Sequence, residues 1–407
     1  MQKRFTPDAG GVFPEWEEVT LGDIAEFSRG KGLTKKDVSE KGERKCLLYG
    51  QLQVRYGTII KNVTGMTDVE LKNPVLSKSG DVLISGTISA GLAKASCIKE
   101  DGVIIGGDIN ILRPKEGIDG EFLARAINAN TKKFKRFLEG SVILHLKNEN
   151  IKEVSIRIPK SIEEQRKIAA AFAAYDEMIA VKTAKLETWQ ECKKRMVKEI
   201  FGRTKRFKDD DGREFPEWEE KTLGEISEPL KYGMSAAAVK YDGENKYLRI
   251  TDIDEASRKY VSDKIASPEA SKITEKFLVQ KNDLLFARTG ASVGKTYLYD
   301  ETDGKMYYAG YLIKAHIKPE YDSQFIFQLT LTNEFKKWVK KESMRTAQPG
   351  INAECLAKYK MMIPCIEEQQ KIGSFLAEID KEIEIQKEFI KTYAEGKKRM
   401  MRELMEW

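Results

Sequence analysis

The sequence is poor in the residues on which most metalloproteins and hydrolases depend. Its 407 residues include only two histidines, His145 and His316, which leaves almost no material for a histidine metal site or a Ser-His-Asp relay. The five cysteines are odd in number and form no Cys-x-x-Cys pair, so neither a disulfide framework nor a zinc ribbon is indicated. No apolar run approaches the roughly 18 residues of a membrane span, and the first residues lack the apolar stretch of a signal peptide. We therefore expect a cytoplasmic protein without a resident metal.

Motifs for nucleotide binding and catalysis are also missing or incomplete. Thr289 stands where a phosphate-binding loop ending in Gly294-Lys295-Thr296 needs its first glycine, so this segment is interpreted as a polar surface turn. The E-x-K tripeptide that begins at Glu70 lacks the Pro-Asp of a nuclease metal site. No Asn-Pro-Pro-Tyr or Asp-Pro-Pro-Tyr element is present, and no G-x-G-x-x-G follows a strand. We expect a chain that catalyses nothing by itself and holds no cofactor.

The composition indicates a folded protein of more than one domain. The chain is two to three times the usual size of a single domain. It is 41% hydrophobic and 33% charged, with 17 Phe, 15 Tyr and 5 Trp, which is enough apolar material for packed cores. Its 70 basic and 64 acidic residues give a net charge of +6, an excess that is compatible with a polyanionic partner without demonstrating one.

The sequence contains two copies of one plan. The hexapeptide Phe-Pro-Glu-Trp-Glu-Glu at 13–18 returns at 215–220, an offset of 202 residues, and Thr-Leu-Gly at 20–22 returns at 222–224. Near the end of each half the offset becomes 204. Three elements repeat there: Ile-Glu-Glu-Gln at 162–165 and 366–369, the aspartates Asp176 and Asp380, and Lys-Lys-Arg-Met at 193–196 and 397–400. The segments 28–75 and 230–278 share little, so the halves have one scaffold and different interiors.

Each half ends in a pattern typical of a long coiled-coil helix, predicted over 159–203 and 364–407. The apolar residues recur at alternating spacings of four and three, interrupted by Lys182 and Lys193 in the first helix and by Gln386 and Lys397 in the second. The predicted seam consists of Ile168, Phe172, Tyr175, Ile179, Leu186, Trp189, Met196, Ile200, Ile372, Leu376, Ile379, Ile383, Ile390, Tyr393, Met400 and Leu404. We expect the two helices to form an antiparallel coiled coil with a pseudo-twofold relation. The alternative is that each helix packs only across its own domain.

The fold class that follows is α/β (α+β): two globular domains separated by two long helices. Runs such as 81–84, 108–112 and 284–287 read as strands, and 122–137 and 323–341 as helices. The domain limits are predicted as 1–158 for the first globular domain, 159–203 for the first helix, 204–363 for the second globular domain and 364–407 for the second helix.

Two kinds of segment recur in both halves and are candidates for binding DNA. The first is a loop after an apolar strand, where glycines allow close approach and hydroxyl and basic groups can donate to phosphates or base edges. Its candidate residues are Ser85, Thr87, Ser89 and Lys94 in the first half, and Arg288, Thr289, Ser292 and Lys295 in the second. The alternative is a solvated turn between strands.

The second recurring segment is a short basic helix around an aromatic residue, Phe134 or Trp338. Its cations would follow a nucleic-acid backbone. They are Lys132, Lys133, Lys135 and Arg136 in the first half and Lys336 and Lys337 in the second. The alternative is an ordinary amphipathic helix with both aromatic rings in the core and the lysines in water.

Together these motifs resemble the specificity subunit of type I restriction-modification systems, over essentially the whole chain. The resemblance rests on the Phe-Pro-Glu-Trp-Glu-Glu opening, the Ile-Glu-Glu-Gln closing and the Lys-Lys-Arg-Met end of each half. It implies two target recognition domains that each read one half of a split DNA site. It also implies helices that set the spacing and dock two modification (methyltransferase) subunits. S-adenosylmethionine would then be held by the modification subunits, and ATP and Mg²⁺ by restriction subunits with motor and nuclease activity.

The residues themselves also favour two readers at a fixed separation, and therefore an asymmetric bipartite site in double-stranded DNA. Two other classes of function stay open at this point. One is a stand-alone DNA-modifying enzyme, which the missing motifs disfavour. The other is a coiled-coil scaffold whose modules bind peptides or proteins and have no role on DNA.

Overall fold

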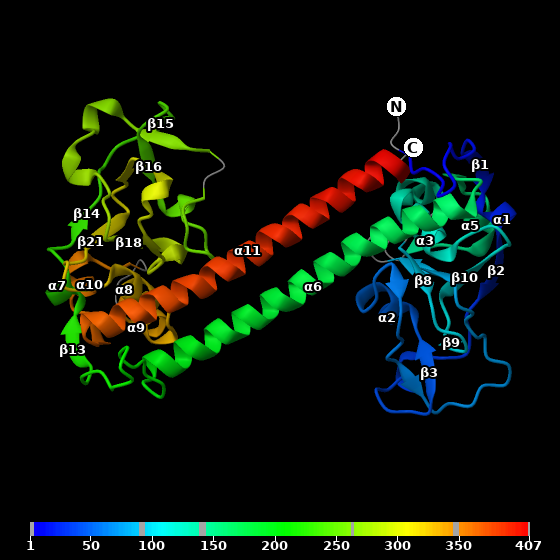
Figure 1. Cartoon of the computed structure of the whole chain (residues 1–407), viewed down its shortest axis with the longest axis horizontal. Helices are drawn as coiled ribbons and strands as arrows, with labels where there is room; N and C mark the ends of the chain where they lie inside the picture. Colours follow the sequence, from blue (N-terminus) through cyan, green and yellow to red (C-terminus); the bar gives the residue numbers. More distant parts are fainter. Residues whose placement is uncertain (1–3, 89–93, 138–143, 262–263, 345–349, 406–407) are drawn as a thin grey trace. The chain divides into compact units, whose positions relative to one another are not determined.

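The structure is a computed structural model that describes residues 4–88, 94–137, 144–261, 264–344 and 350–405. The chain divides into two compact units, which are described separately (Figure 1). Unit 1 combines residues 1–183 with 388–407, and unit 2 is the continuous segment 184–387. None of the helices in the described ranges is both long enough and apolar enough to cross a membrane.

Unit 1 is built around a five-stranded sheet. Its strand order is β2 (Ala25–Arg29), β10 (Ile109–Pro114), β6 (Val82–Ser85), β8 (Ala95–Ile98) and β4 (Ile59–Ile60). A three-stranded sheet has the order β5 (Met66–Thr67), β3 (Arg44–Leu47) and β9 (Ile104–Ile105), and two pairs join β1 (Glu17–Thr20) to β12 (Ser155–Ile158) and β7 (Thr87–Ile88) to β11 (Leu144–His145). The short helices are α1 (Leu21–Ile24), α2 (Tyr49–Val54), α3 (Gly120–Ala129), α4 (Thr131–Phe134) and α5 (Asn148–Lys152).

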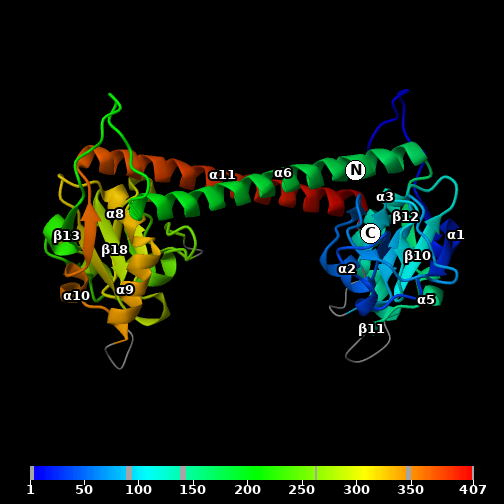
Figure 2. The ribbon, with the colours of Figure 1, turned by 90° about the horizontal axis from the view of Figure 1, so that it is seen from below.

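Unit 2 is built around a four-stranded antiparallel sheet. Its strand order is β14 (Lys231–Tyr232), β21 (Leu312–His316), β18 (Asp283–Ala287) and β19 (Thr296–Leu298). Three strand pairs surround it: β13 (Glu219–Thr222) with β22 (Lys360–Ile363), β15 (Ala238–Lys240) with β17 (Ala266–Pro268), and β16 (Lys246–Leu248) with β20 (Met306–Tyr308). The short helices are α7 (Leu223–Ile226), α8 (Ser323–Thr330), α9 (Asn333–Ser343) and α10 (Ala353–Ala357), of which α8 packs on β18 and β19 (Figure 2).

The two units share one strand order, even though parts of their sequences differ. The order β2-β10-β6-β8 corresponds to β14-β21-β18-β19, and the pair β1–β12 to β13–β22. The repeated Thr-Leu-Gly forms the same helix start in both, because Thr20 and Thr222 cap a one-turn helix and bond to Asp23 and Glu225. These hydrogen bonds lower the pKa of each of the two carboxyl groups. The predicted mixed α/β domains are confirmed.

The long helices are α6 (Ile162–Phe201) and α11 (Ile366–Met405), which lie inside the predicted ranges 159–203 and 364–407. Within unit 1, Asp176 near the start of α6 binds Lys397 near the end of α11. Within unit 2, Lys193 near the end of α6 binds Asp380 near the start of α11. Each unit therefore contains an antiparallel helix pair, as predicted. All sixteen seam residues are buried or partly buried. The predicted domain limits themselves stay predictions.

The repeated Phe-Pro-Glu-Trp and Ile-Glu-Glu-Gln motifs meet in each unit and fasten the globular part to its long helix. In unit 1, buried Glu164 on α6 accepts hydrogen bonds from Trp16 Nε1 (3.2 Å) and from Arg4 Nη2 (2.8 Å). In unit 2, Glu368 on α11 accepts them from Trp218 Nε1 (3.1 Å) and Arg206 Nη2 (2.8 Å). The repeated hexapeptide therefore has a structural role, because its tryptophan donates a hydrogen bond to a carboxylate that is buried and needs such partners.

The core of each unit includes residues from both long helices. In unit 1, Ile168 and Phe172 of α6 pack with Leu404 and Met405 of α11, and Asn130 Nδ2 donates to the carbonyl of Met405 at 3.1 Å. In unit 2, the last turns of α6 and the first turns of α11 pack on the domain between them in the chain.

Candidate nucleic-acid interface

In unit 2 the end of β18 presents a guanidinium group. Arg288, the first residue after β18, donates its backbone N–H to the carbonyl of Tyr311 (3.0 Å) and accepts from the N–H of Ile351 (2.9 Å). Its guanidinium carbon lies 4.9 Å from the centre of the Tyr232 ring, a cation–π contact. The Nε atom is buried and has no hydrogen-bond partner in the described part of the chain. The head group is therefore held by stacking, and no carboxylate of the described residues pairs with it.

Three more residues surround Arg288 at this sheet end. Thr289 forms an isolated antiparallel β-bridge with Gly350. The Tyr232 hydroxyl accepts a hydrogen bond from the N–H of Ala353 at 2.9 Å. Tyr311 is 62% exposed and Tyr232 is 41% exposed. We call Tyr232, Arg288, Thr289 and Tyr311 the unit 2 sheet-end cluster. It combines flat aromatic surface with a fork of hydrogen-bond donors, which suits contact with bases.

Unit 1 has the same backbone arrangement with other side chains. Gly86 follows β6, donates its N–H to the carbonyl of Asp108 (2.6 Å) and accepts from the N–H of Leu146 (2.9 Å). Thr87 pairs with His145, and Arg29 at the end of β2 forms an ion pair with Asp108. Arg29, Thr87, Asp108 and His145 form the unit 1 sheet-end cluster. The two units thus place different chemistry at the same point of the same scaffold.

Most of the predicted loop residues lie at or near these sheet ends. Thr87, Lys94, Arg288, Thr289 and Ser292 are exposed or partly exposed, so their assignment to DNA stays a prediction. Ser89 lies outside the described residues.

Two of the predicted loop residues are turned inward, and for them the prediction was wrong. Ser85 is 2% exposed and its hydroxyl donates to the carbonyl of Thr87 (2.6 Å). Lys295 is 8% exposed, donates to the carbonyl of Ile253 (3.0 Å) and pairs with Glu255 (3.2 Å). The ammonium group of Lys295 therefore neutralises a carboxylate within the protein, and these two side chains are not available to a ligand.

The predicted basic helices carry exposed cations over a packed core. Phe134 of α4 is fully buried, and Trp338 of α9 is partly buried against Tyr359, at 4.8 Å between ring centres. Both aromatic rings therefore pack in the core, as the alternative of an ordinary amphipathic helix predicted. Lys133 is partly buried and donates to the carbonyl of Ser155. The remaining predicted cations are exposed: Lys132, Lys135, Arg136, Lys336 and Lys337.

In unit 2 the structure brings one predicted loop and one predicted helix together. A cavity of about 380 Å³ is lined by residues 291–296 of the loop and by α9, including Ser292 and Lys336. Gly294 has φ +79°, and a Cβ atom there would lie 2.6 Å from a methyl group of Val339 on α9. Glycine is therefore required for this close approach of the loop to the helix.

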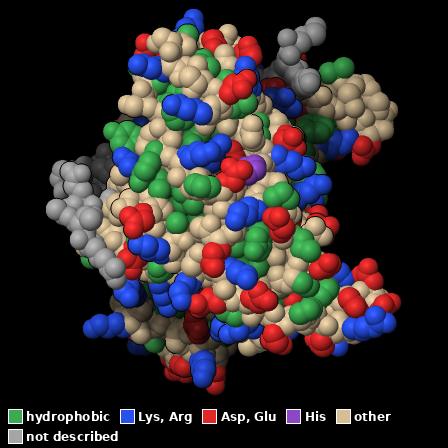
Figure 3. All heavy atoms as spheres, turned by 90° about the vertical axis from the view of Figure 1, so that its left-hand side faces the viewer, with side chains coloured by type: hydrophobic (Ala, Val, Ile, Leu, Met, Phe, Trp, Pro, Cys, Tyr) green, Lys and Arg blue, Asp and Glu red, His purple; other side chains and the backbone are tan. Residues whose placement is uncertain are grey.

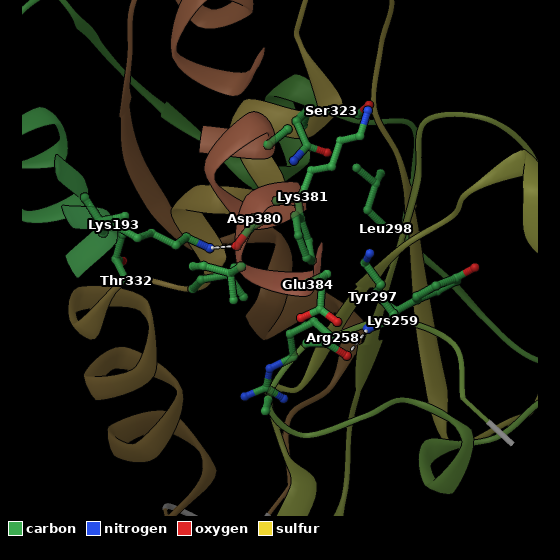
Figure 4. A pocket seen from close by; sticks show the side chains of 18 of the residues that line it. Lys193, Arg258, Lys259, Tyr297, Leu298, Ser323, Thr332, Asp380, Lys381 and Glu384 are labelled. Atoms are coloured by element: carbon green, nitrogen blue, oxygen red, sulfur yellow. Dashed lines mark hydrogen bonds and ion pairs between the residues drawn. The ribbon is translucent and has the colours of Figure 1, made fainter. Parts of the chain in front are cut away.

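Unit 2 also has a groove of about 1730 Å³ on the side of its long helices (Figure 4). Figure 4 shows Lys193 paired with Asp380 on one wall, and Arg258 and Lys259 on another. Within it the Tyr297 hydroxyl donates to a carboxylate oxygen of Asp303 at 2.6 Å. Burial raises the pKa of both groups. The residues that line the groove include both acidic and basic side chains. Acidic and basic side chains are also interspersed on the molecular face shown in Figure 3.

Sequence reasoning missed five members of the sheet-end clusters: Arg29, Asp108, His145, Tyr232 and Tyr311. Each lies at the end of a strand or in a turn that pairing brings beside the predicted loop, far away in the chain. A signal was available for Asp108, because it follows two glycines and precedes an apolar strand. In the described ranges no group of three or more His, Cys, Asp or Glu side chains is arranged to hold a metal ion.

Comparison with known proteins agrees with this duplicated plan. The family model described as type I restriction modification DNA specificity domain matches residues 14–188 and again residues 216–392. The chain belongs to this family. It carries two specificity domains, and each match extends from the globular part well into the following long helix.

One relative of the specificity-domain family matches nearly the whole chain, and another matches about half of it. The type I restriction enzyme MjaVIII specificity subunit of Methanocaldococcus jannaschii is 23% identical over 414 residues, covering 96% of this chain and 92% of that protein. The MjaIX specificity subunit of the same organism is 26% identical over 236 residues, covering 54% of this chain and 53% of its own. The crystal structure of the S subunit of a type I restriction-modification system from M. genitalium has the same fold. Its TM-score is 0.69 at 15% identity, covering 98% of this chain and 99% of that one.

Proposed function

We propose that this specificity subunit reads an asymmetric bipartite site in double-stranded DNA, with unit 1 reading one half-site and unit 2 the other. The observation that carries the proposal is the pair of sheet-end clusters. Their backbone hydrogen bonds correspond one to one, whereas their exposed side chains differ. A common scaffold with different contact residues is what two readers of different short sequences require.

The long helices and the groove of unit 2 support docking of modification subunits. Met178 and Val181 on α6 are exposed apolar residues one turn apart in unit 1. The groove has both signs of charge, which suits a protein surface better than a uniformly anionic DNA backbone. We propose that two modification subunits bind along the helices and that restriction subunits join them.

In this proposal the chain does no chemistry of its own. S-adenosylmethionine belongs to the modification subunits, and ATP with Mg²⁺ to the restriction subunits, all acting on cytoplasmic DNA. The chain contributes recognition, and the length of its helices sets the spacing between half-sites.

Methylation mapping in a host that supplies the modification subunits tests the proposal. With the chain, one bipartite motif should be methylated, and without it none. Exchanging residues 13–158 for those of a relative should change only one half of the motif. Methylation by the chain alone would identify a stand-alone enzyme, and the absence of any salt-dependent DNA binding by the assembled complex would favour a protein-binding scaffold.

A further inference from the structure

The two sheet-end clusters correspond position by position once the hydrogen bonds are followed. The N–H of Gly86 bonds to the carbonyl of Asp108 as that of Arg288 bonds to Tyr311. Gly86 is therefore equivalent to Arg288, and Asp108 to Tyr311. Arg29 pairs with Asn110, the second residue of β10. Tyr232 pairs with Ile313, the second residue of β21. Arg29 is thus equivalent to Tyr232.

In both clusters a guanidinium group lies between the same two positions of the sheet end, although the arginine stands at a different one of the two positions in each unit. In unit 2 it belongs to Arg288 itself and lies over the Tyr232 ring. In unit 1 the equivalent position is Gly86, and a Cβ atom built there would lie 3.4 Å from Nη2 of Arg29. The Arg29 guanidinium therefore lies directly beside the place where a side chain at Gly86 would begin. The absence of a side chain at Gly86 leaves that space open.

The surroundings of Arg29 favour a base edge over a phosphate. Its Nη2 atom pairs with one oxygen of Asp108, whose other oxygen accepts from the Thr87 hydroxyl at 2.9 Å. The pair has no net charge, which is unfavourable for binding a phosphate. No other hydrogen bond or ion pair of the Arg29 guanidinium is found in the described residues, and the side chain is 50% exposed, so donors on its outer edge remain free.

Asp108 is held in an unusual conformation beside Arg29. Its φ is +62°, in the left-handed region that few residues other than glycine, asparagine and aspartate adopt. The conformation directs the carbonyl to Gly86 while the carboxylate engages Arg29 and Thr87. Such strain is kept where the surroundings impose it, which is frequent at functional sites.

We propose that Arg29 is the specificity-determining residue of unit 1. It donates a bidentate pair of hydrogen bonds to a guanine edge in the first half-site, and Asp108 is its positioning residue. The role rests on the proposed function, and it makes Arg29 the counterpart of Arg288 despite their unrelated places in the sequence.

The test uses the full chain assembled with the modification subunits of its own system and a pool of randomised DNA duplexes. Bound duplexes are sequenced for the unchanged protein and for Arg29→Lys, Asp108→Asn and Arg113→Lys. Lysine keeps the positive charge of Arg29 but cannot donate the two parallel hydrogen bonds of a guanidinium group. Arg113 is the matched control, because it also pairs with an aspartate, Asp81, but at the other end of β10, where β6 begins.

The expected result for Arg29→Lys is a loss of roughly ten- to hundredfold in discrimination at one guanine of one half-site, with the other half-site unchanged. Asp108→Asn, which tolerates the left-handed conformation, should weaken discrimination at the same base pair. Arg113→Lys should leave the motif intact. A motif unchanged in Arg29→Lys would overturn the inference alone. Failure of the unchanged protein to select any motif would overturn the proposed function and the inference with it.

Discussion

Lys397 of α11 places its ammonium nitrogen 2.5 Å from a carboxylate oxygen of Asp176 on α6. The other oxygen of Asp176 accepts from Nη1 of the buried Arg125 at 2.9 Å. Unit 2 repeats the arrangement, with Lys193 and Gln328 as the two donors to Asp380. These lysines are two of the polar interruptions in the apolar seam. Each of the two therefore has a partner on the opposite helix, which fixes the register of the antiparallel pair.

Exchanging the charges of Lys193 and Asp380 should reveal their coupling. Lys193→Glu alone places two carboxylates together and should lower the free energy of unfolding of unit 2 by about 1 kcal/mol, and Asp380→Lys should do the same. The double variant should recover much of that loss, because the pair is restored with reversed polarity. Urea unfolding followed by tryptophan fluorescence provides the measurement. Additive losses in the double variant would contradict the pairing.

Removing the charge of Glu368 should cost more than removing that of its neighbour. Glu368→Gln leaves Arg206 with only the exposed Glu217 as a carboxylate partner and should destabilise unit 2 by about 3 kcal/mol, because the buried partner of the ion pair is lost. Glu367→Gln, at a more exposed position, should cost less than about 0.5 kcal/mol. The free energies of unfolding of both variants decide the matter, and equal losses would show that the contact with Trp218 and Arg206 is unimportant.

The thiols of unit 1 should resist alkylation in the folded protein. Burial raises the pKa of Cys97 to about 12 and also raises that of Cys46. At pH 8 the thiolate, which is the reactive form, is therefore scarce at both. Labelling with iodoacetamide and peptide mass spectrometry should find Cys97 roughly a hundredfold slower than the partly exposed Cys192. Comparable rates in the native protein, as expected after unfolding in urea, would argue against the packing of β8.

The exposed lysines of α9 should act through charge alone. Replacing Lys336 or Lys337 with Ala should weaken binding of the assembled complex to cognate and unrelated DNA about equally. Each replacement should also reduce the salt slope by roughly 1, because one phosphate fewer is neutralised. Lys208→Ala is the control and should leave the slope unchanged, because this exposed lysine pairs with Glu214 and lines neither the cavity nor the groove of unit 2. Affinities at several salt concentrations give the slope. A change in sequence preference instead would assign α9 to base contacts.

Lengthening both long helices tests whether they set the spacing. Inserting seven residues near Leu186 in α6 and seven near Lys387 in α11 keeps the heptad seam and adds about 10 Å to the helix pair. The methylated half-sequences should stay the same while the gap grows by about three base pairs, at roughly 3.4 Å each. Mapping of methylated sites gives the gap, and an unchanged gap would remove the helices from this role.

The scaffold could be predicted from the sequence because its signals are local or exactly repeated. The heptad pattern located the seam residues, from Ile168 to Leu404, and the strands at 82–85 and 283–287 follow runs of apolar residues. The repeated hexapeptide identified the two halves, although its task became clear only when the structure placed Trp16 beside Glu164. A buried carboxylate and its donors lie far apart in the chain, and periodicity carries no information about such contacts.

The contact residues were harder to predict because a motif does not say which way its side chains point. Ser85 and Lys295 looked suited to DNA, but their polar atoms are used by Thr87, Ile253 and Glu255. Arg29 was missed because its role arises from pairing with a strand about eighty residues away. Aligning the two halves does not reveal Arg29 either. It lies on β2, whose equivalent in unit 2, β14, carries Tyr232 and no arginine at that position.

The last turn of α11 has a consequence for the order in which the protein is completed during synthesis. Leu404 and Met405 belong to the core of unit 1, and Asn130 bonds to the backbone of Met405. Unit 1 therefore lacks part of its core until the ribosome has made Leu404 and Met405. Unit 2, a continuous segment ending at Lys387, has all its residues earlier. Domains generally fold in the order of their synthesis. Here unit 2, although most of it is synthesised after the globular part of unit 1, is the first unit whose core residues are all present.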